Sequence, residues 1–258
     1  MDTDYKVKDF LVKRRAMLML KEGIFEDKAK KEAWLSSLTE FVNLPHSKED
    51  YFTYERYLVN GYADAGFEDK AIALNTKRMA KIGWNNSHYK FTRDFTFLTP
   101  ESVDLFESLP VVEAKNMLAI GCHEGQSALY FLDNFMYTYD SVDLVDIENL
   151  PNLHHNIKGK NGIKFHHMDS NTFKFEKMYD FIHVNGSKDR ETYETDIRRS
   201  LEHLNDNGVL LLSYMSVMDK QLRSTAYSFS EEESYNLEKL NIVGLKVPFL
   251  ALKKLPKN

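Results

Sequence analysis

Short apolar runs alternate with longer stretches of helical spacing over the second half of this chain. The runs are almost continuous, which is typical of parallel strands buried on both faces. They cover residues 117–120, 141–147, 163–168, 179–184 and 209–214. After the first run, Leu129, Leu132 and Met136 recur at intervals of three and four, and similar spacing returns over 190–204. Strands that alternate with helices predict an α/β fold built on a parallel sheet.

Helical spacing also dominates the first third of the chain. The predicted helices cover residues 7–20, 29–41 and 51–82. We expect the last of them to be interrupted at Gly61 and Gly66. Residues 84–100 lack this spacing and are rich in aromatic and hydroxyl side chains, so they predict either a lid over a binding site or a packed connector. We therefore divide the chain into a helical extension, 1–88, and an α/β domain, 89–258.

The loop after the first predicted strand is the candidate binding site. Gly121 and Gly125 bracket it, and Ser127 is expected to cap the helix that follows. A strand that turns through glycines into a helix presents free backbone N–H groups at its carboxyl end, where open α/β sheets bind ligands. His123 occupies the place of the middle glycine in a dinucleotide fingerprint. The spacing therefore favours a cofactor without a pyrophosphate, such as S-adenosylmethionine.

Polar residues also follow the next predicted strands. Asp146 lies near the ~20-residue offset at which a carboxylate reaches a ribose hydroxyl, although it could instead cap the next helix. Asp169 and Ser170 follow the third strand, and Asn185 follows the fourth. One ligand lying across the carboxyl edge of a parallel sheet would require this repeated pattern.

Composition narrows the partners and the compartment. The chain has 258 residues and a formal net charge of −5, which provides no basic surplus for nucleic-acid phosphates. Cys122 is the single cysteine, as expected in a reducing compartment. The charged start lacks the apolar region of a signal peptide, and no stretch reaches the ~20 apolar residues of a membrane span. These features predict a cytoplasmic protein that binds neither nucleic acid nor membrane.

Four segments together resemble a known family. They are IGCHEGQSALYFLDNF, VDLVDIE, HHMDS and YDFIHVNGSKDRETYETDIRRSLEHLNDNGVLLL. The set resembles the class I S-adenosylmethionine-dependent methyltransferases, particularly the small-molecule O-methyltransferase group that includes the macrocin and catechol types, over residues 89–215. The resemblance implies a Rossmann-like sheet with helices on both faces.

The same resemblance implies a cofactor site. The loop from Gly121 to Gly125 would lie beside the methionine part, Asp146 would hold the ribose, and Asp169 with Ser170 would lie near the adenine. The expected cofactor-binding residues are Gly121, Cys122, His123, Glu124, Gly125, Ser127, Asp146, Asp169, Ser170 and Asn185.

Three positions depart from the family pattern. Ala119 stands where an acidic residue usually precedes the Ile-Gly pair, Asn185 replaces an aspartate, and Ser213 replaces part of an acidic pair. Magnesium prefers anionic oxygen ligands, so we expect no metal in this site.

These observations predict a metal-independent methyltransferase that acts on a small-molecule hydroxyl. The alternative is a catalytically degenerate, methyltransferase-like module for binding or assembly. The catalytic base stays unassigned, and the candidates are His123, His183 and Lys188. The helices of 1–88 offer a contact for a homo-oligomer.

Overall fold

The computed structural model describes residues 29, 31–33, 35–36, 48–93, 98–186, 189–213, 220–240 and 249–256. Contacts within the chain form two units, Met1–Arg78 with Phe91–Asp94 and Met79–Lys90 with Phe95–Asn258. The division that we expected at residue 88 stays a prediction. No helix in the described ranges is long and apolar enough to cross a membrane.

The first unit contains two described helices, α3 (Lys48–Asp64) and α4 (Glu68–Ala80). They confirm helical structure over 51–80 and the break at Gly66, whose φ of 78° suits glycine. Gly61 lies inside α3, so the break expected there is wrong. The helices share a small buried cluster of Leu35, Leu58, Val59, Tyr62 and Ala71. The helix expected over 7–20 lies outside the described residues.

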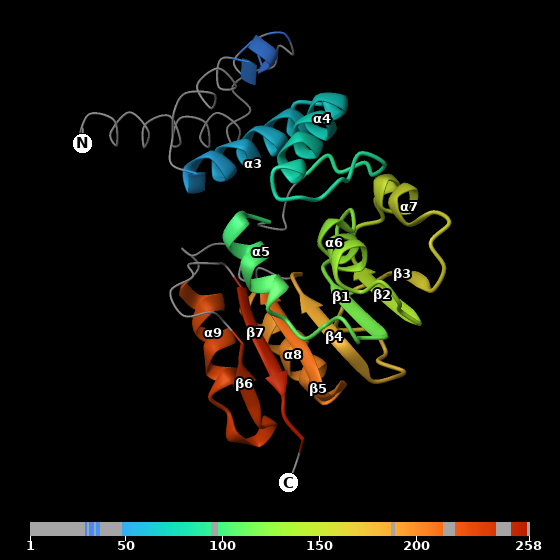
Figure 1. Ribbon diagram of the computed structural model, residues 1–258, viewed down its shortest axis with the longest axis vertical. Coiled ribbons are helices and arrows are strands. Elements are labelled where there is room, and N and C mark those ends of the chain that lie inside the picture. Colours follow the sequence, from blue (N-terminus) through green and yellow to red (C-terminus); the bar gives the residue numbers. More distant parts are fainter. Residues whose placement is uncertain are drawn as a thin grey trace, which may run out of the picture. The chain divides into compact units, whose positions relative to one another are not determined.

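The second unit is built on one seven-stranded sheet in the order β3-β2-β1-β4-β5-β7-β6 (Figure 1). Its strands are β1 (Asn116–Ile120), β2 (Ser141–Asp146), β3 (Ile163–His167), β4 (Tyr179–Val184), β5 (Leu204–Ser213), β6 (Leu237–Lys239) and β7 (Phe249–Lys254). The first five are parallel, whereas β7 is antiparallel to β5 and β6 to β7. The sheet confirms the predicted fold class and all five predicted parallel strands.

Helices cover both faces of this sheet. They are α5 (Pro100–Glu107), α6 (Gln126–Asn134), α7 (Pro151–Ile157), α8 (Arg190–Glu202) and α9 (Lys220–Ser230), followed by a short 3-10 turn, η1 (Glu233–Tyr235). On one face, the Phe131 ring of α6 lies 4.9 Å from that of Phe106 and 4.7 Å from that of Phe181 in β4. On the other, α8 and α9 pack over Leu118, Ile182 and Leu210. Sequence patterning did not predict α7.

Candidate functional site

The carboxyl ends of three strands lie level with one another. Ile120 at the end of β1 pairs with Val145 of β2 on one side and with Val184 of β4 on the other. The residues that follow directly are Gly121, Asp146 and Asn185. Because β1 and β4 are neighbours without being consecutive, this edge is the crossover point at which open α/β sheets bind ligands.

Backbone of β1 and β4 meets closely at this point. Gly121 has a φ of 72°, and a Cβ added to it would lie 2.1 Å from the Cα of Gly186. The N–H of Asn185 donates to the carbonyl of Ile120 at 2.8 Å, which holds the two chains together. Only glycine at position 121 satisfies both the left-handed backbone and this contact.

Asp146 fixes the loop that follows Gly121. Its Oδ2 accepts a hydrogen bond from the N–H of His123 at 2.6 Å, and its Oδ1 accepts from the N–H of Glu148 at 2.9 Å. His123 has a φ of 48°, which is uncommon for a residue with a side chain, and the bond to Asp146 supports it. The Asp146 carboxylate therefore organises the loop and retains lone pairs for a ligand.

The helix after the loop begins differently from our expectation. Gly125 occupies the N-cap position with a φ of 84°, and no side chain caps α6. Ser127 lies inside the first turn and is buried, so its predicted capping role is wrong. A left-handed glycine starts the helix because the loop arrives at an angle that residues with a Cβ rarely adopt.

Two apolar side chains that the sequence analysis did not single out lie exposed near Asp146. Ile147 follows it directly and is 68% exposed, and Met168 at the end of β3 is 37% exposed. Both side chains therefore leave apolar surface accessible beside Asp146, whose carbonyl accepts from the N–H of Met168. The sequence signal that could have identified both residues is their position, because each directly follows the last residue of a strand, β2 or β3.

The segment after β3 is held by α8. Asp169 is exposed, and its Oδ1 accepts from the N–H of Asn171 at 2.8 Å. Arg199 of α8 donates to the carbonyls of Ser170 and Phe173. The segment predicted to face the adenine is thus fixed by its backbone, which leaves the Asp169 side chain at the surface.

Asn185 presents a buried acceptor. Its N–H is used in the bond to β1, whereas its Oδ1 is buried and has no hydrogen-bond partner. A buried amide oxygen without a partner costs free energy, and such an atom at a sheet edge fits a ligand that carries an N–H or O–H donor.

Two candidate bases have defined surroundings. His183 is 1% exposed, its Nε2 lies 2.8 Å from Ser213 Oγ, and burial lowers its pKa to about 3. That is the arrangement of a neutral, hydrogen-bonded core residue. His123 lies in the loop with its Nε2 3.6 Å from a Glu148 carboxylate oxygen. Lys188 lies outside the described residues, and the roles of all three stay predictions.

Cys122 lies within the loop but is shielded. Its side chain is 4% exposed, and burial, with a smaller effect from Asp146, raises the pKa of its thiol well above the usual value. The thiol therefore stays protonated and packs as a small apolar group. Glu124 is also buried, and its Oε1 accepts from Asn152 Nδ2 at 2.9 Å.

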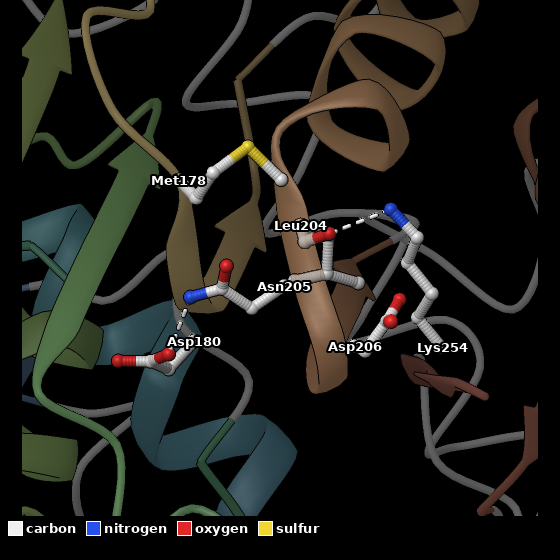
Figure 2. Close-up of a pocket in the computed structure, with 6 residues that line it drawn as sticks. All are labelled: Met178, Asp180, Leu204, Asn205, Asp206 and Lys254. Atoms are coloured by element: carbon white, nitrogen blue, oxygen red, sulfur yellow. Dashed lines mark hydrogen bonds between the residues drawn. The ribbon is translucent and has the colours of Figure 1, made fainter. Parts of the chain in front are cut away.

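A pocket elsewhere on the unit belongs to the opposite edge. Its volume is about 470 Å³, and it lies at the amino ends of β4 and β5. Figure 2 shows six residues that line it, among them Asp180 and Asn205. Its polar groups serve the fold: Asp180 accepts from Asn205 at 2.7 Å and from backbone N–H groups of Lys115 and Asn116, both at 2.9 Å. Burial opposes ionisation of Asp180, but these bonds outweigh it and lower the pKa. The pocket lies away from the loop and Asp146.

No group of three or more His, Cys, Asp or Glu side chains in the described ranges could hold a metal ion. The loop edge does fit S-adenosylmethionine. Asp146 offers a carboxylate for hydroxyl groups, Ile147 and Met168 offer apolar surface, and the orphaned oxygen of Asn185 suits a cationic or hydroxyl donor.

Fold and site define a class I S-adenosylmethionine-dependent methyltransferase. The sequence profile of the family described as tellurite resistance protein TehB matches residues 85–235, more than half of the chain. The chain belongs to this family, and S-adenosylmethionine is its cofactor. No curated protein is significantly similar to it in sequence.

Solved structures resemble the fold. The precorrin-6y C5,15-methyltransferase of Geobacter metallireducens GS-15 has a TM-score of 0.50 and 13% identity, covering 67% of this chain and 97% of its own. The N-methyltransferase NodS of Bradyrhizobium japonicum WM9, in complex with S-adenosyl-L-homocysteine, has a TM-score of 0.47 and 18% identity, covering 64% and 90%. The S-adenosylhomocysteine-bound methyltransferase PaMTH1 of Podospora anserina has a TM-score of 0.47 and 16% identity. The match covers 61% of this chain and 78% of PaMTH1. At these identities the likeness concerns the fold alone.

We expect Gly121→Ala to destabilise the protein and to abolish S-adenosylhomocysteine binding, because the added Cβ collides with Gly186 backbone. The loss in free energy of unfolding should exceed about 3 kcal/mol, measured by urea denaturation. Gly159→Ala is the matched control, since Gly159 has a φ of 77° with open space around it. It should cost only about 1–2 kcal/mol and leave binding intact. Equal stability of the two variants would contradict the close contact.

Asp196 of α8 generates a pH prediction. It is 1% exposed, and both of its carboxylate oxygens are buried. Burial raises its pKa to about 6, although the neighbouring Ser170 hydroxyl and Arg199 favour the charged form. Since an unfolded aspartate titrates near ~3.9, the folded state binds this proton more tightly. Stability from this group is therefore fullest below about pH 4 and declines as the pH rises towards about 6.

Asp196→Asn should accordingly be more stable than the wild type at pH 7.5, by about 2–3 kcal/mol. The difference should shrink as the pH falls from about 6 and approach zero below about pH 3, where the wild-type carboxyl is protonated in both states. Urea denaturation across this range measures it, and Glu202→Gln, exposed on the same helix, is the control. A constant difference between Asp196→Asn and wild type at every pH would be evidence against the raised pKa.

Proposed function

We propose that this methyltransferase acts without a metal on the hydroxyl group of a small molecule in the cytoplasm. The main support is the neutral, unpartnered Oδ1 of Asn185 at the carboxyl end of β4, beside the Gly121 loop. A hydroxyl donates to such an oxygen and keeps a lone pair free for attack. The resemblance to small-molecule O-methyltransferases supports the same acceptor class, and the single cysteine suits a reducing compartment.

The residues at this edge have different roles in the proposed reaction. The cofactor supplies a methyl group on a positively charged sulfur. Asp146 receives hydroxyl donors of the cofactor and keeps the His123 backbone in place. Asn185 lies beside the cofactor, as expected from the sequence, and its Oδ1 also orients the acceptor. It takes no proton, because an amide oxygen is too weak a base at ordinary pH, so the hydroxyl proton passes to water or to the base that stays unassigned when the methyl group is transferred. Positioning at near-attack distance therefore carries most of the rate enhancement.

The chemistry of the strand ends supports metal independence. Asn185 after β4 and Ser213 at the end of β5 provide an amide and a hydroxyl. Both are neutral, and the Ser213 hydroxyl already pairs with His183. A magnesium ion prefers anionic oxygens, so this donor set attracts it weakly.

The proposal extends to partners. The net charge of −5 opposes binding to nucleic acid, and we propose neither nucleic acid nor membrane as a partner. The amino-terminal helices remain our proposed contact for a homo-oligomer.

Asp146→Asn should weaken S-adenosylhomocysteine binding by about tenfold to a hundredfold, the value of hydrogen bonds to a charged group. The amide keeps the side-chain shape but turns one N–H donor towards the backbone N–H groups that Asp146 now accepts from. Calorimetric titration measures the dissociation constant. Glu148→Gln, two residues away and exposed, should change it less than about twofold. Similar affinities for wild type and Asp146→Asn would remove Asp146 from the cofactor site.

Acceptor class and metal independence can be tested together. Small phenols and alcohols, amines, thiols and tellurite are incubated with the protein and S-adenosylmethionine, with and without EDTA, and S-adenosylhomocysteine formation is measured. We expect turnover with a hydroxyl compound at the same rate in EDTA. A requirement for added Mg²⁺ would contradict metal independence, and turnover only with amines, thiols or tellurite would contradict the acceptor class. Tight cofactor binding with no turnover on any acceptor would favour the degenerate module.

A further inference from the structure

Residues 84–90 are fixed to the methyltransferase unit rather than free to move as a lid. Trp84 and Tyr89 are 2% and 3% exposed. The Trp84 Nε1–H donates to Asp133 Oδ2 at 3.0 Å, and the Tyr89 hydroxyl donates to the same carboxylate at 2.9 Å. Burial and the neighbouring Asp133 charge raise the pKa of Tyr89, so it remains a donor. This segment is therefore a packed connector that is held against α6 by Trp84 and Tyr89.

Asn156 of α7 holds the end of this connector. Its side chain is 3% exposed. Its Oδ1 accepts from the N–H of Lys90 at 2.7 Å, and its Nδ2 donates to the carbonyl of Lys90 at 3.2 Å. The amide thus pairs with both backbone groups of one residue, as a neighbouring strand would do.

The same side chain also contacts the loop from Gly121 to Gly125, which we call the cofactor loop because we predict that it binds the cofactor. Asn156 Nδ2 donates to the carbonyl of Glu124 at 3.0 Å. Glu124 lies between His123 and Gly125, both of which have left-handed backbone. Glycine adopts this conformation freely, but at His123, which carries a side chain, it persists only where surrounding contacts hold it. Asp146 holds the N–H of His123 from β2, and Asn156 holds the next carbonyl from α7.

From this geometry we infer that Asn156 is a positioning residue for the cofactor loop, which it ties to the backbone of Lys90. Ordering of the loop by the cofactor then stabilises the Lys90 backbone, and docking of Lys90 in turn favours the loop conformation that binds the cofactor. The inference concerns cofactor binding alone and does not depend on which acceptor is methylated.

An Asn156→Asp variant tests this role. Its carboxylate can still accept from Lys90 N–H but turns negative oxygens towards the carbonyls of Lys90 and Glu124. At pH 8.5 we expect S-adenosylhomocysteine to bind about tenfold more weakly than to wild type. The ratio to wild type should move towards one as the pH falls through the pKa of the introduced carboxyl, because a protonated carboxyl donates a hydrogen bond again. The KM for S-adenosylmethionine should rise with kcat within about threefold of wild type.

Asn152→Asp is the matched control. Asn152 lies on the same helix and donates to the Glu124 side chain rather than to its carbonyl. Its variant should weaken S-adenosylhomocysteine binding clearly less than Asn156→Asp does at pH 8.5, since the Glu124 carbonyl keeps its bond to Asn156. An Asn156→Asp affinity equal to wild type at pH 8.5, or an equal loss of affinity in the two variants, would overturn the inference.

Hydrogen exchange of the wild type provides a second readout that needs no variant. Exchange of the Lys90 N–H, which is bonded to Asn156, should slow at least several-fold when S-adenosylhomocysteine is added. Unchanged exchange at Lys90 under saturating ligand would overturn the coupling even if Asn156→Asp fails to fold. The binding titration and the exchange measurement use the ligand without an acceptor, so failure of the proposed hydroxyl chemistry would affect only the KM and kcat readout.

Discussion

Close backbone approach between Gly121 and Gly186 is the constraint on which the methyltransferase unit depends. β1 and β4 are separated by two strands in the sequence yet adjacent in the sheet, and their carboxyl ends meet where a Cβ on Gly121 would lie 2.1 Å from Gly186. This contact turns the chain after β1 into the cofactor loop. It also brings Asn185 to the same level as Asp146, so one ligand can meet both.

The cofactor loop is supported from two sides. Asp146 binds the backbone of His123, and Asn156 binds the carbonyl of the following residue. Left-handed backbone at a residue with a side chain is unfavourable by itself, so these bonds provide the compensating free energy. Because Asp146 is also the predicted ribose ligand, the residue that shapes the loop is the one that would sense its occupancy.

Reactive groups near this edge are kept uncharged by burial. His183 and Cys122 are both nearly inaccessible, and burial lowers the pKa of the imidazole and raises that of the thiol. Asn185 and Ser213 are neutral by chemistry. In contrast to the Asp146 carboxylate at the end of β2, the side chains after β4 and at the end of β5 therefore bring no charge to this edge, which fits the proposed reaction with an oriented acceptor.

The pattern of apolar and polar residues along the chain by itself determined most of the parallel sheet. Period and composition predicted the parallel strands, including both ends of β4, and the loop glycines with Asp146 indicated the edge at which we predict that the cofactor binds. Only tertiary structure decided other features. α7 has too few apolar residues to show a helical period. Residues 205–208, which separate the predicted helical segment 190–204 from the predicted strand 209–214, are part of β5, whose pairing with β4 contains a register shift. Asn156 carries no local signal, because its partners are distant in sequence. An amide on a short helix acquires a role only when the fold brings Lys90 and Glu124 to it.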